Sequence, residues 1–153
     1  MCGRRRSLWT RAVSGPNPIG VRLERLAGFI AVLESPGFVA AEYVTTEPRE
    51  GVWTLPYPRY HPEVDRFVSV AYEDGWVRTD FDWVKWSATQ EARTLRDDPV
   101  ALAAATPDQL AKLITVLVRQ ERFNEGSLRC AFEDGLVLAI VRRAGVLAGQ
   151  ANP

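Results

Sequence analysis

The chain is poor in the residue types that most often carry catalysis or bind metals. Among 153 residues it has one histidine, His61, and two cysteines, Cys2 and Cys130. A single histidine excludes an HExxH metalloprotease and a two-histidine iron site within one chain. No CxxC pair occurs, which excludes zinc-ribbon and thioredoxin-like motifs. We interpret Cys130 as a small buried apolar residue and His61 as a turn residue, with a catalytic Cys130–His61 pair as the weaker alternative.

An excess of charge of one sign and long apolar runs are also missing. The 19 basic and 19 acidic residues give a formal net charge of zero, whereas a nucleic-acid-binding domain usually shows a basic excess. No apolar run approaches the length of a transmembrane helix, and no glycine-rich phosphate loop or GxSxG nucleophile motif occurs. Free thiols are typical of a reducing compartment. We therefore predict a cytoplasmic protein with no cofactor, no metal ion and no membrane association.

The first twenty residues differ from the rest of the chain. They carry four arginines and no acidic residue, and residues 14–20 are rich in glycine and proline. We predict that residues 1–20 form a basic disordered tail, and not a secretory signal, because no apolar core follows the arginines. Two alternatives stay open: an extension from a misplaced upstream start codon, or a segment that binds an acidic surface.

What is present is the composition of one globular domain. Hydrophobic residues make up 46% of the chain and charged residues 25%, which is typical of a soluble folded protein. Apolar residues recur at helical spacing over most of the chain, so residues 21–149 are predicted to form a single compact all-α domain of five to six helices. The predicted helices cover 21–34, 62–74, 83–97, 107–122 and 124–134, with a last one from 136 that ends at Gly145 or Gly149.

Capping signals predict where several of these helices begin and end. Thr106-Pro107-Asp108-Gln109 has an N-cap threonine, a proline at the first helical position and a glutamine three residues after the threonine, which together predict a capping box. Pro62 marks another helix start, and Gly75 is placed to end that helix in a left-handed conformation. Asp80 or Asp82 is predicted to cap the next helix.

The long loop after the first predicted helix is unlike the rest of the domain. Residues 38–60 contain three prolines and show no helical periodicity. Two short extended pieces, 42–45 and 52–55, predict a small β-hairpin within this loop.

Aromatic residues are concentrated in this loop and after it. Nine of the chain's fifteen aromatic residues lie between Trp53 and Trp86. One interpretation is a core wall in which tryptophan N–H groups bond to carboxylates such as Asp82, and the other is an aromatic-lined groove. Trp53, Tyr57 and Tyr60 lie in the loop and are predicted to be exposed and to bind a partner, because loops on a rigid scaffold often carry binding.

A second cluster combines arginine and glutamate. Arg119 and Arg122 lie three residues apart and so occupy neighbouring positions on one helical face, with Glu125 following them. The structural interpretation is that the arginines tie helix ends and loops to carboxylates, while Phe123 fills the core. The alternative is a pocket in which these side chains bind a carboxylate or phosphate beside the tryptophans of residues 81–86.

These segments also form an ordered pattern. FDWVKW at 81–86 is followed by the capping box, by VRQERFNEGSL at 118–128 and by FEDG. This set resembles a family of small bacterial proteins classed as a domain of unknown function, over roughly 23–146. The resemblance implies a mainly helical domain and no known activity. Cysteine and histidine often fill the positions of Asn124 and Ser127 in the family pattern, so thiol or imidazole chemistry is not expected in this loop.

The sequence therefore supports two hypotheses of different kinds. The first is a cytoplasmic protein-binding or regulatory module whose surface combines residues 53–60 with residues 81–86, because no catalytic motif occurs and tryptophan and arginine dominate interface hot spots. The second is an enzyme or small-ligand-binding protein whose pocket is lined by the two arginines, Glu125, Trp83 and Trp86. Nucleic acid is expected as a partner only through the basic tail.

Overall fold

The computed structural model describes residues 17–151, and its buried centre is the helix that carries the capping box. This helix, α7 (Pro107–Gln120), begins at Thr106, whose hydroxyl accepts a hydrogen bond from the Gln109 N–H. The Gln109 side chain in turn accepts from the Thr106 N–H, which confirms the predicted box. Every residue from 113 to 118 is buried, because other elements pack on several sides of α7.

The helices are more numerous than the five to six predicted, because two predicted helices are interrupted. The first is broken at Gly28, and the third is broken where Thr89 caps a new helix by accepting from the Ala92 N–H. The alanine-rich turn after Asp98 also forms a short helix. The remaining helices are α1 (Ile19–Ala27), α2 (Ile30–Leu33), α3 (Pro62–Glu73), α4 (Trp83–Ser87), α5 (Gln90–Asp97), α6 (Pro99–Ala103), α8 (Ser127–Glu133) and α9 (Leu136–Ala151).

The first described helix begins close to the predicted start of the domain. Helix α1 begins at Ile19, two residues before the predicted start of the domain, while residues 1–16 of the predicted basic tail lie outside the described range. No helix within residues 17–151 is long and apolar enough to cross a membrane.

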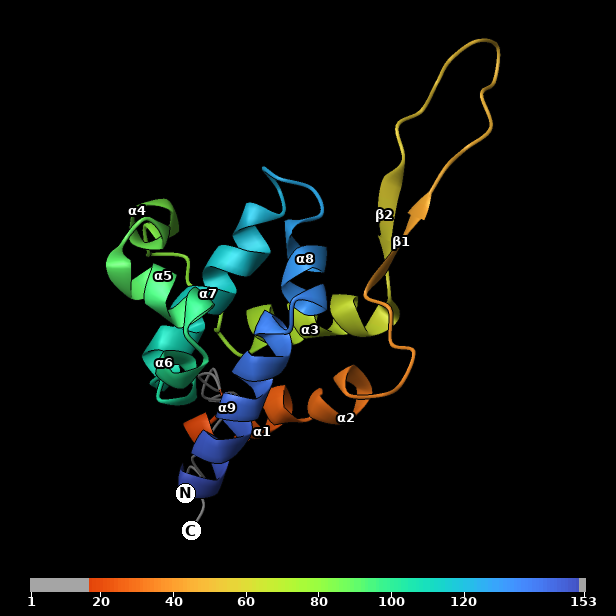
Figure 1. Cartoon of the computed structure of the whole chain (residues 1–153). Helices are drawn as coiled ribbons and strands as arrows, with labels where there is room; N and C mark the ends of the chain where they lie inside the picture. The colour runs from red at the N-terminus through yellow and green to blue at the C-terminus, as the bar shows by residue number, and fades with distance from the viewer. Residues whose placement is uncertain (1–16, 152–153) are drawn as a thin grey trace, which may run out of the picture.

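The first and last helices cross, and α9 also packs against α2, α6, α7 and α8 (Figure 1). Gly145 lies at the crossing, where an added Cβ would meet Ala27 Cβ and Ile30 Cδ1, each at 3.5 Å. The prediction that Gly145 or Gly149 ends this helix is wrong. The glycine allows the close approach of α1 instead, and α9 continues to Ala151.

The turn after α3 links three parts of the core. Gly75 has a φ of 72°, which confirms its predicted role at the end of this helix. The preceding Asp74 is 1% exposed and pairs with the Arg25 guanidinium of α1. On the other side of the turn, the hydroxyl of the buried Thr115 on α7 accepts from the Arg78 N–H at 3.0 Å. These contacts fix the segment that leads from α3 toward α4.

The predicted hairpin is present and stands away from the helices as an arm, defined here as residues 41–60 (Figure 1). Its strands, β1 (Ala41–Val44) and β2 (Tyr57–Tyr60), pair antiparallel. The second strand was predicted at 52–55, which is too early in the chain. Residues 57–60 pair instead because Tyr43 and Tyr60 lie against the helical domain, whereas residues 52–55 are all exposed.

The tip of the arm is a tight turn. Arg49 and Val52 form an isolated antiparallel bridge, and the residues between them, Glu50 and Gly51, have φ values of 53° and 78°. Two central residues with positive φ are the mark of a type I′ hairpin turn. Farther down, the hydroxyls of Thr46 and Thr54 lie 2.6 Å apart.

Candidate functional site

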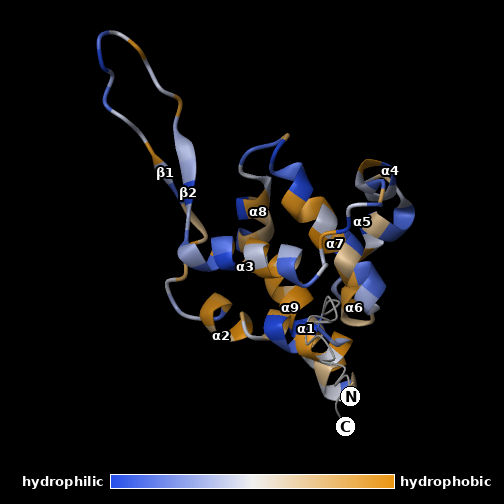
Figure 2. Ribbon diagram, turned by 180° about the vertical axis from the view of Figure 1, so that it is seen from behind, coloured by the Kyte–Doolittle hydropathy of each residue, from blue (hydrophilic) through white to orange (hydrophobic). Residues whose placement is uncertain are grey.

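The outer part of the arm exposes apolar side chains to solvent. Val52 is 68% exposed, Trp53 81% and Leu55 86%. Tyr57, at the start of β2, is also exposed. Hydrophobic and hydrophilic stretches follow one another along the arm, with no other element beside them (Figure 2). This places two of the predicted partner-binding residues, Trp53 and Tyr57, on an accessible surface.

The base of the arm is fastened to the helical domain through Tyr43 and Tyr60. The Tyr60 hydroxyl donates to Glu121 Oε1 at 2.5 Å. The Arg129 guanidinium of α8 lies over the Tyr43 ring, 4.6 Å from its centroid. Tyr60 was predicted to be a free binding residue, but the structure places it half-buried within an intramolecular contact.

The carboxylate of Glu121 joins the arm to the loop between α7 and α8. Besides the Tyr60 hydroxyl it accepts from the Gly126 N–H at 3.0 Å, the Leu128 N–H at 2.8 Å and the Ser127 hydroxyl at 3.3 Å. Gly126 is the N-cap of α8 and has no side chain to cap it, so Glu121 satisfies N–H groups that the helix leaves open. Sequence reasoning missed this role, although the uncapped glycine was its signal.

The Tyr60 contact predicts a pH dependence of stability. Burial and the hydrogen bond to Glu121 raise the pKa of the Tyr60 hydroxyl above its ordinary value. Because its pKa is higher in the folded state, the hydroxyl contributes its full stabilisation below the unfolded-state pKa, which is near 10. This contribution to the free energy of unfolding is lost as the pH rises toward the folded-state pKa. We expect the free energy of unfolding by urea to fall more steeply above about pH 10 in the wild type than in Tyr60→Phe. Equal slopes would show that the hydroxyl does not contribute.

A second site is a hollow of about 330 Å³ beside α4 and the C-terminal end of α7, two helices that pack together. It is lined by Trp83, Val84, Arg119, Arg122 and Phe123. The Trp83 and Phe123 rings lie with their centroids 6.0 Å apart and their planes tilted by 32°. The prediction that Phe123 fills the core is wrong, because this side chain is 80% exposed.

The two arginines of this hollow form no ion pair with any carboxylate in the described part of the chain. Among residues 17–151, neither Arg119 nor Arg122 takes part in an ion pair. Arg119 Nη2 donates to the Arg78 carbonyl at 3.4 Å, and its buried Nε has no hydrogen-bond partner. The interpretation in which these arginines tie the chain to nearby carboxylates is therefore not what the structure shows.

The other residues predicted for this pocket have different surroundings. Trp86 is 8% exposed, and its Nε1 donates to Glu91 Oε1 at 3.0 Å, so it belongs to the core wall. Asp82 is the N-cap of α4 and accepts from the Lys85 N–H at 3.0 Å, which confirms a predicted cap. Glu125 is exposed and does not line the hollow.

The rare residues have structural positions that the sequence only partly predicted. His61 is the N-cap of α3, where its side chain accepts from the Glu63 N–H at 3.1 Å. The prediction that Cys130 is buried is wrong, because it faces solvent on α8. Within residues 17–151, no three histidine, cysteine or acidic side chains are grouped to hold a metal ion.

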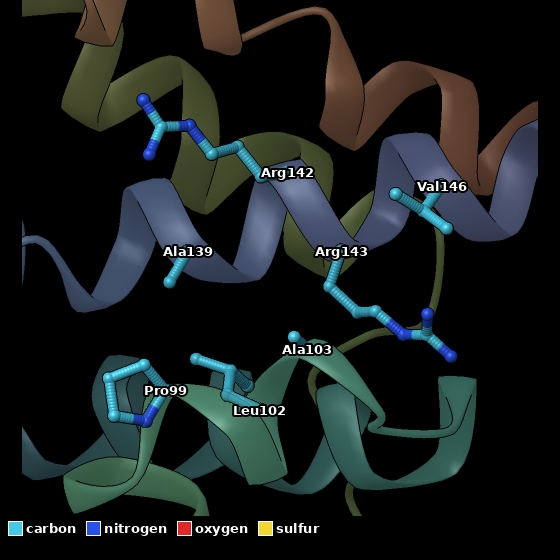
Figure 3. Close-up of a pocket in the computed structure, with 7 residues that line it drawn as sticks. All are labelled: Pro99, Leu102, Ala103, Ala139, Arg142, Arg143 and Val146. Atoms are coloured by element: carbon cyan, nitrogen blue, oxygen red, sulfur yellow. The ribbon is translucent and has the colours of Figure 1, made fainter.

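A third hollow, of about 200 Å³, lies between α6 and α9 and is mostly apolar (Figure 3). Its two cations are already engaged within the domain. Arg142 pairs with Glu34 at 2.7 Å, and Arg143 Nε donates to the Ala105 carbonyl at 2.8 Å. This hollow therefore offers a ligand few unsatisfied polar groups.

The fold and these sites define a small helical domain with a projecting hairpin arm and an arginine-lined, partly aromatic hollow. The model of a family described as "Family of unknown function (DUF6508)" matches residues 20–150, and the chain belongs to that family. The family match confirms the resemblance to a domain of unknown function. Neither a curated protein nor a solved structure matches the chain.

Proposed function

We propose that the protein is a protein-binding module that holds a partner with the outer part of its arm. The observation that carries this proposal is the exposure of Val52, Trp53 and Leu55 on a segment with no core of its own. Burying one large apolar side chain contributes about 1.5–3 kcal/mol, and tryptophan is a frequent interface hot spot. A partner with an apolar groove would bury these side chains together.

The way the arm is built supports the same function. A lone two-stranded hairpin is at best marginally stable in water, but this one is fastened at its base by Tyr60 and Glu121 and closed at its tip by Glu50 and Gly51. A segment that is ordered before binding loses less conformational entropy when it binds. The arm runs out and back over residues 41–60, so about ten residues lie on each side, and at about 3.3 Å per residue it would reach roughly 30 Å from the domain.

Alanine substitution at the arm tests this proposal. Trp53→Ala should leave the unfolding temperature nearly unchanged, since the side chain is 81% exposed, and should weaken partner binding by about 2 kcal/mol or more. The partner is found by photo-crosslinking from p-benzoyl-phenylalanine placed at position 53, purified, and titrated by calorimetry with each variant.

A matched control is Tyr72→Ala, which removes an exposed aromatic side chain from α3, outside the arm. Its affinity for the purified partner should equal that of the wild type. The proposal fails if both variants bind alike, or if Trp53→Ala unfolds the domain. A crosslink between two copies of this chain would identify the arm as a self-association surface instead.

A further inference from the structure

The hollow beside α4 and α7 contains positive charge that the domain does not use. Arg78, the nearest arginine along the chain to α4, pairs with Asp108 at 2.5 Å. Asp108 also accepts from Lys112 at 3.2 Å. Burial acts to raise the pKa of Asp108, but the hydrogen bonds and charges of Arg78 and Lys112 together hold this pKa below its ordinary value. Arg119 and Arg122 have no such carboxylate within residues 17–151.

Arg119 is the more unusual of the two. Within residues 17–151, its buried Nε has no hydrogen-bond partner, and its one hydrogen bond is the 3.4 Å bond from Nη2 to the Arg78 carbonyl. A buried donor without a partner is unfavourable, and a guanidinium offers several N–H groups in a planar fork that matches carboxylate and phosphate oxygens. Arg119 also lines the hollow, so the positive charge of its guanidinium faces an anion bound there.

The other walls are apolar and accessible. Phe123 is 80% exposed and Val84 is 60% exposed, while Trp83 lies beside Phe123 with its ring tilted by 32°. These apolar side chains lie next to the guanidinium groups of Arg119 and Arg122, which form no ion pair within residues 17–151. The hollow is therefore apolar on one side and cationic on the other. Small-molecule sites combine these features, and their volumes begin at about 300 Å³, close to the 330 Å³ of this hollow.

We propose that this hollow binds a small organic anion, in which a carboxylate or phosphate is attached to a flat apolar group. Arg119 and Arg122 hold the anionic group, and Trp83, Val84 and Phe123 contact the apolar group. The site is separate from the arm, so it is independent of the partner-binding function proposed above.

The test uses the full chain and four probes: phenyl phosphate, benzoate, inorganic phosphate and benzyl alcohol. Arginine Nε–H signals are followed by NMR, and affinities are measured by calorimetry. Phenyl phosphate or benzoate should shift the Arg119 Nε–H signal and bind with a dissociation constant of about 1 mM or lower, the range of ordinary metabolites. Benzyl alcohol should not bind, because it lacks the charge, and inorganic phosphate should bind more weakly than phenyl phosphate.

Variants separate the two halves of the site. Arg122 is exposed and makes no ion pair within the described chain, so Arg122→Gln should fold normally and weaken phenyl phosphate by about tenfold, the effect of one charge-assisted hydrogen bond. Arg119→Lys keeps the positive charge but removes the planar, forked guanidinium, so this variant should also bind phenyl phosphate more weakly than the wild type. Phe123→Ala should weaken phenyl phosphate but leave inorganic phosphate unchanged.

Arg93→Gln is the control for net charge, because this exposed arginine of α5 does not line the hollow. It should bind phenyl phosphate as the wild type does, and so should Trp53→Ala on the arm. The proposal is overturned if no anionic probe binds with saturation at millimolar concentration. It is also overturned if Arg93→Gln and Arg122→Gln weaken binding equally, which would show a general attraction of anions to the surface.

Discussion

Replacing Glu121 by alanine should lower the free energy of unfolding by about 3 kcal/mol and loosen the base of the arm. The carboxylate accepts from the Tyr60 hydroxyl, from the Ser127 hydroxyl and from two N–H groups at the start of α8. One hydrogen bond to a charged group contributes about 1.5–3 kcal/mol to the free energy of unfolding. Because Glu121 is only partly buried, its four hydrogen bonds together contribute less than four times that value. Urea unfolding measures this loss.

Hydrogen exchange locates the effect of the same substitution. The amides of Gly126 and Leu128 should exchange faster in Glu121→Ala, because their acceptor is gone. Glu125→Ala is the matched control, since it removes an exposed carboxylate from the same loop. It should change the free energy of unfolding by less than about 0.5 kcal/mol. Similar losses in the two variants would show that Glu121 acts only through its charge.

The hydrogen bonds of Glu121 also show which features of the fold can be predicted from the sequence. Capping depends on residues a few positions apart, so the Thr106–Gln109 box and the helix start at Pro62 were predicted correctly. The acceptor for α8 lies five to seven residues before the N–H groups that it satisfies. This spacing matches no standard capping pattern, so local rules could show from Gly126 that α8 lacks a side-chain cap, but not that Glu121 is the acceptor.

The main differences between predicted and observed helices are at helix ends that carry no strong capping signal. Gly145 was expected to end its helix, but it faces Ala27 and Ile30 of the crossing segment, a contact that periodicity along one helix does not reveal. Gly28 does interrupt a helix, although the apolar pattern of residues 21–34 continues through it. Intrinsic preference is a weak guide wherever packing between distant segments decides.

For the candidate sites, the sequence predicts which residues take part better than how those residues are arranged. The sequence groups Trp83, Arg119 and Arg122 in one pocket, and the structure places all three around the same hollow. Phe123 also lines this hollow, but the sequence predicts it in the core, because apolar residues are usually buried. Trp86 lies three residues after Trp83 and so on the same side of α4, but it is buried in the core, whereas Trp83 is only partly buried against it.

A substitution in the aromatic cluster beneath the arm should have the largest effect on stability. Phe67 of α3 is fully buried and meets Phe29 and Phe132 edge to face, at centroid distances of 5.5 and 5.6 Å. Phe67→Ala should lower the free energy of unfolding by about 3–5 kcal/mol, the range for emptying a buried phenylalanine site. Edge-to-face pairs add about 0.5–1.5 kcal/mol beyond area burial, so the upper part of this range is expected.

Phe67→Leu separates the two contributions, because it keeps most of the buried volume and removes the ring. Its loss in urea unfolding should be less than half that of Phe67→Ala if the cavity dominates. A loss below about 1 kcal/mol in Phe67→Ala would mean that the surrounding side chains close the space. In that case the cluster would not be what joins α3 to Phe29 and to α8. The position of the arm, which leads directly into α3 through His61, would then depend on the contacts of Tyr60 with Glu121 and of Tyr43 with Arg129.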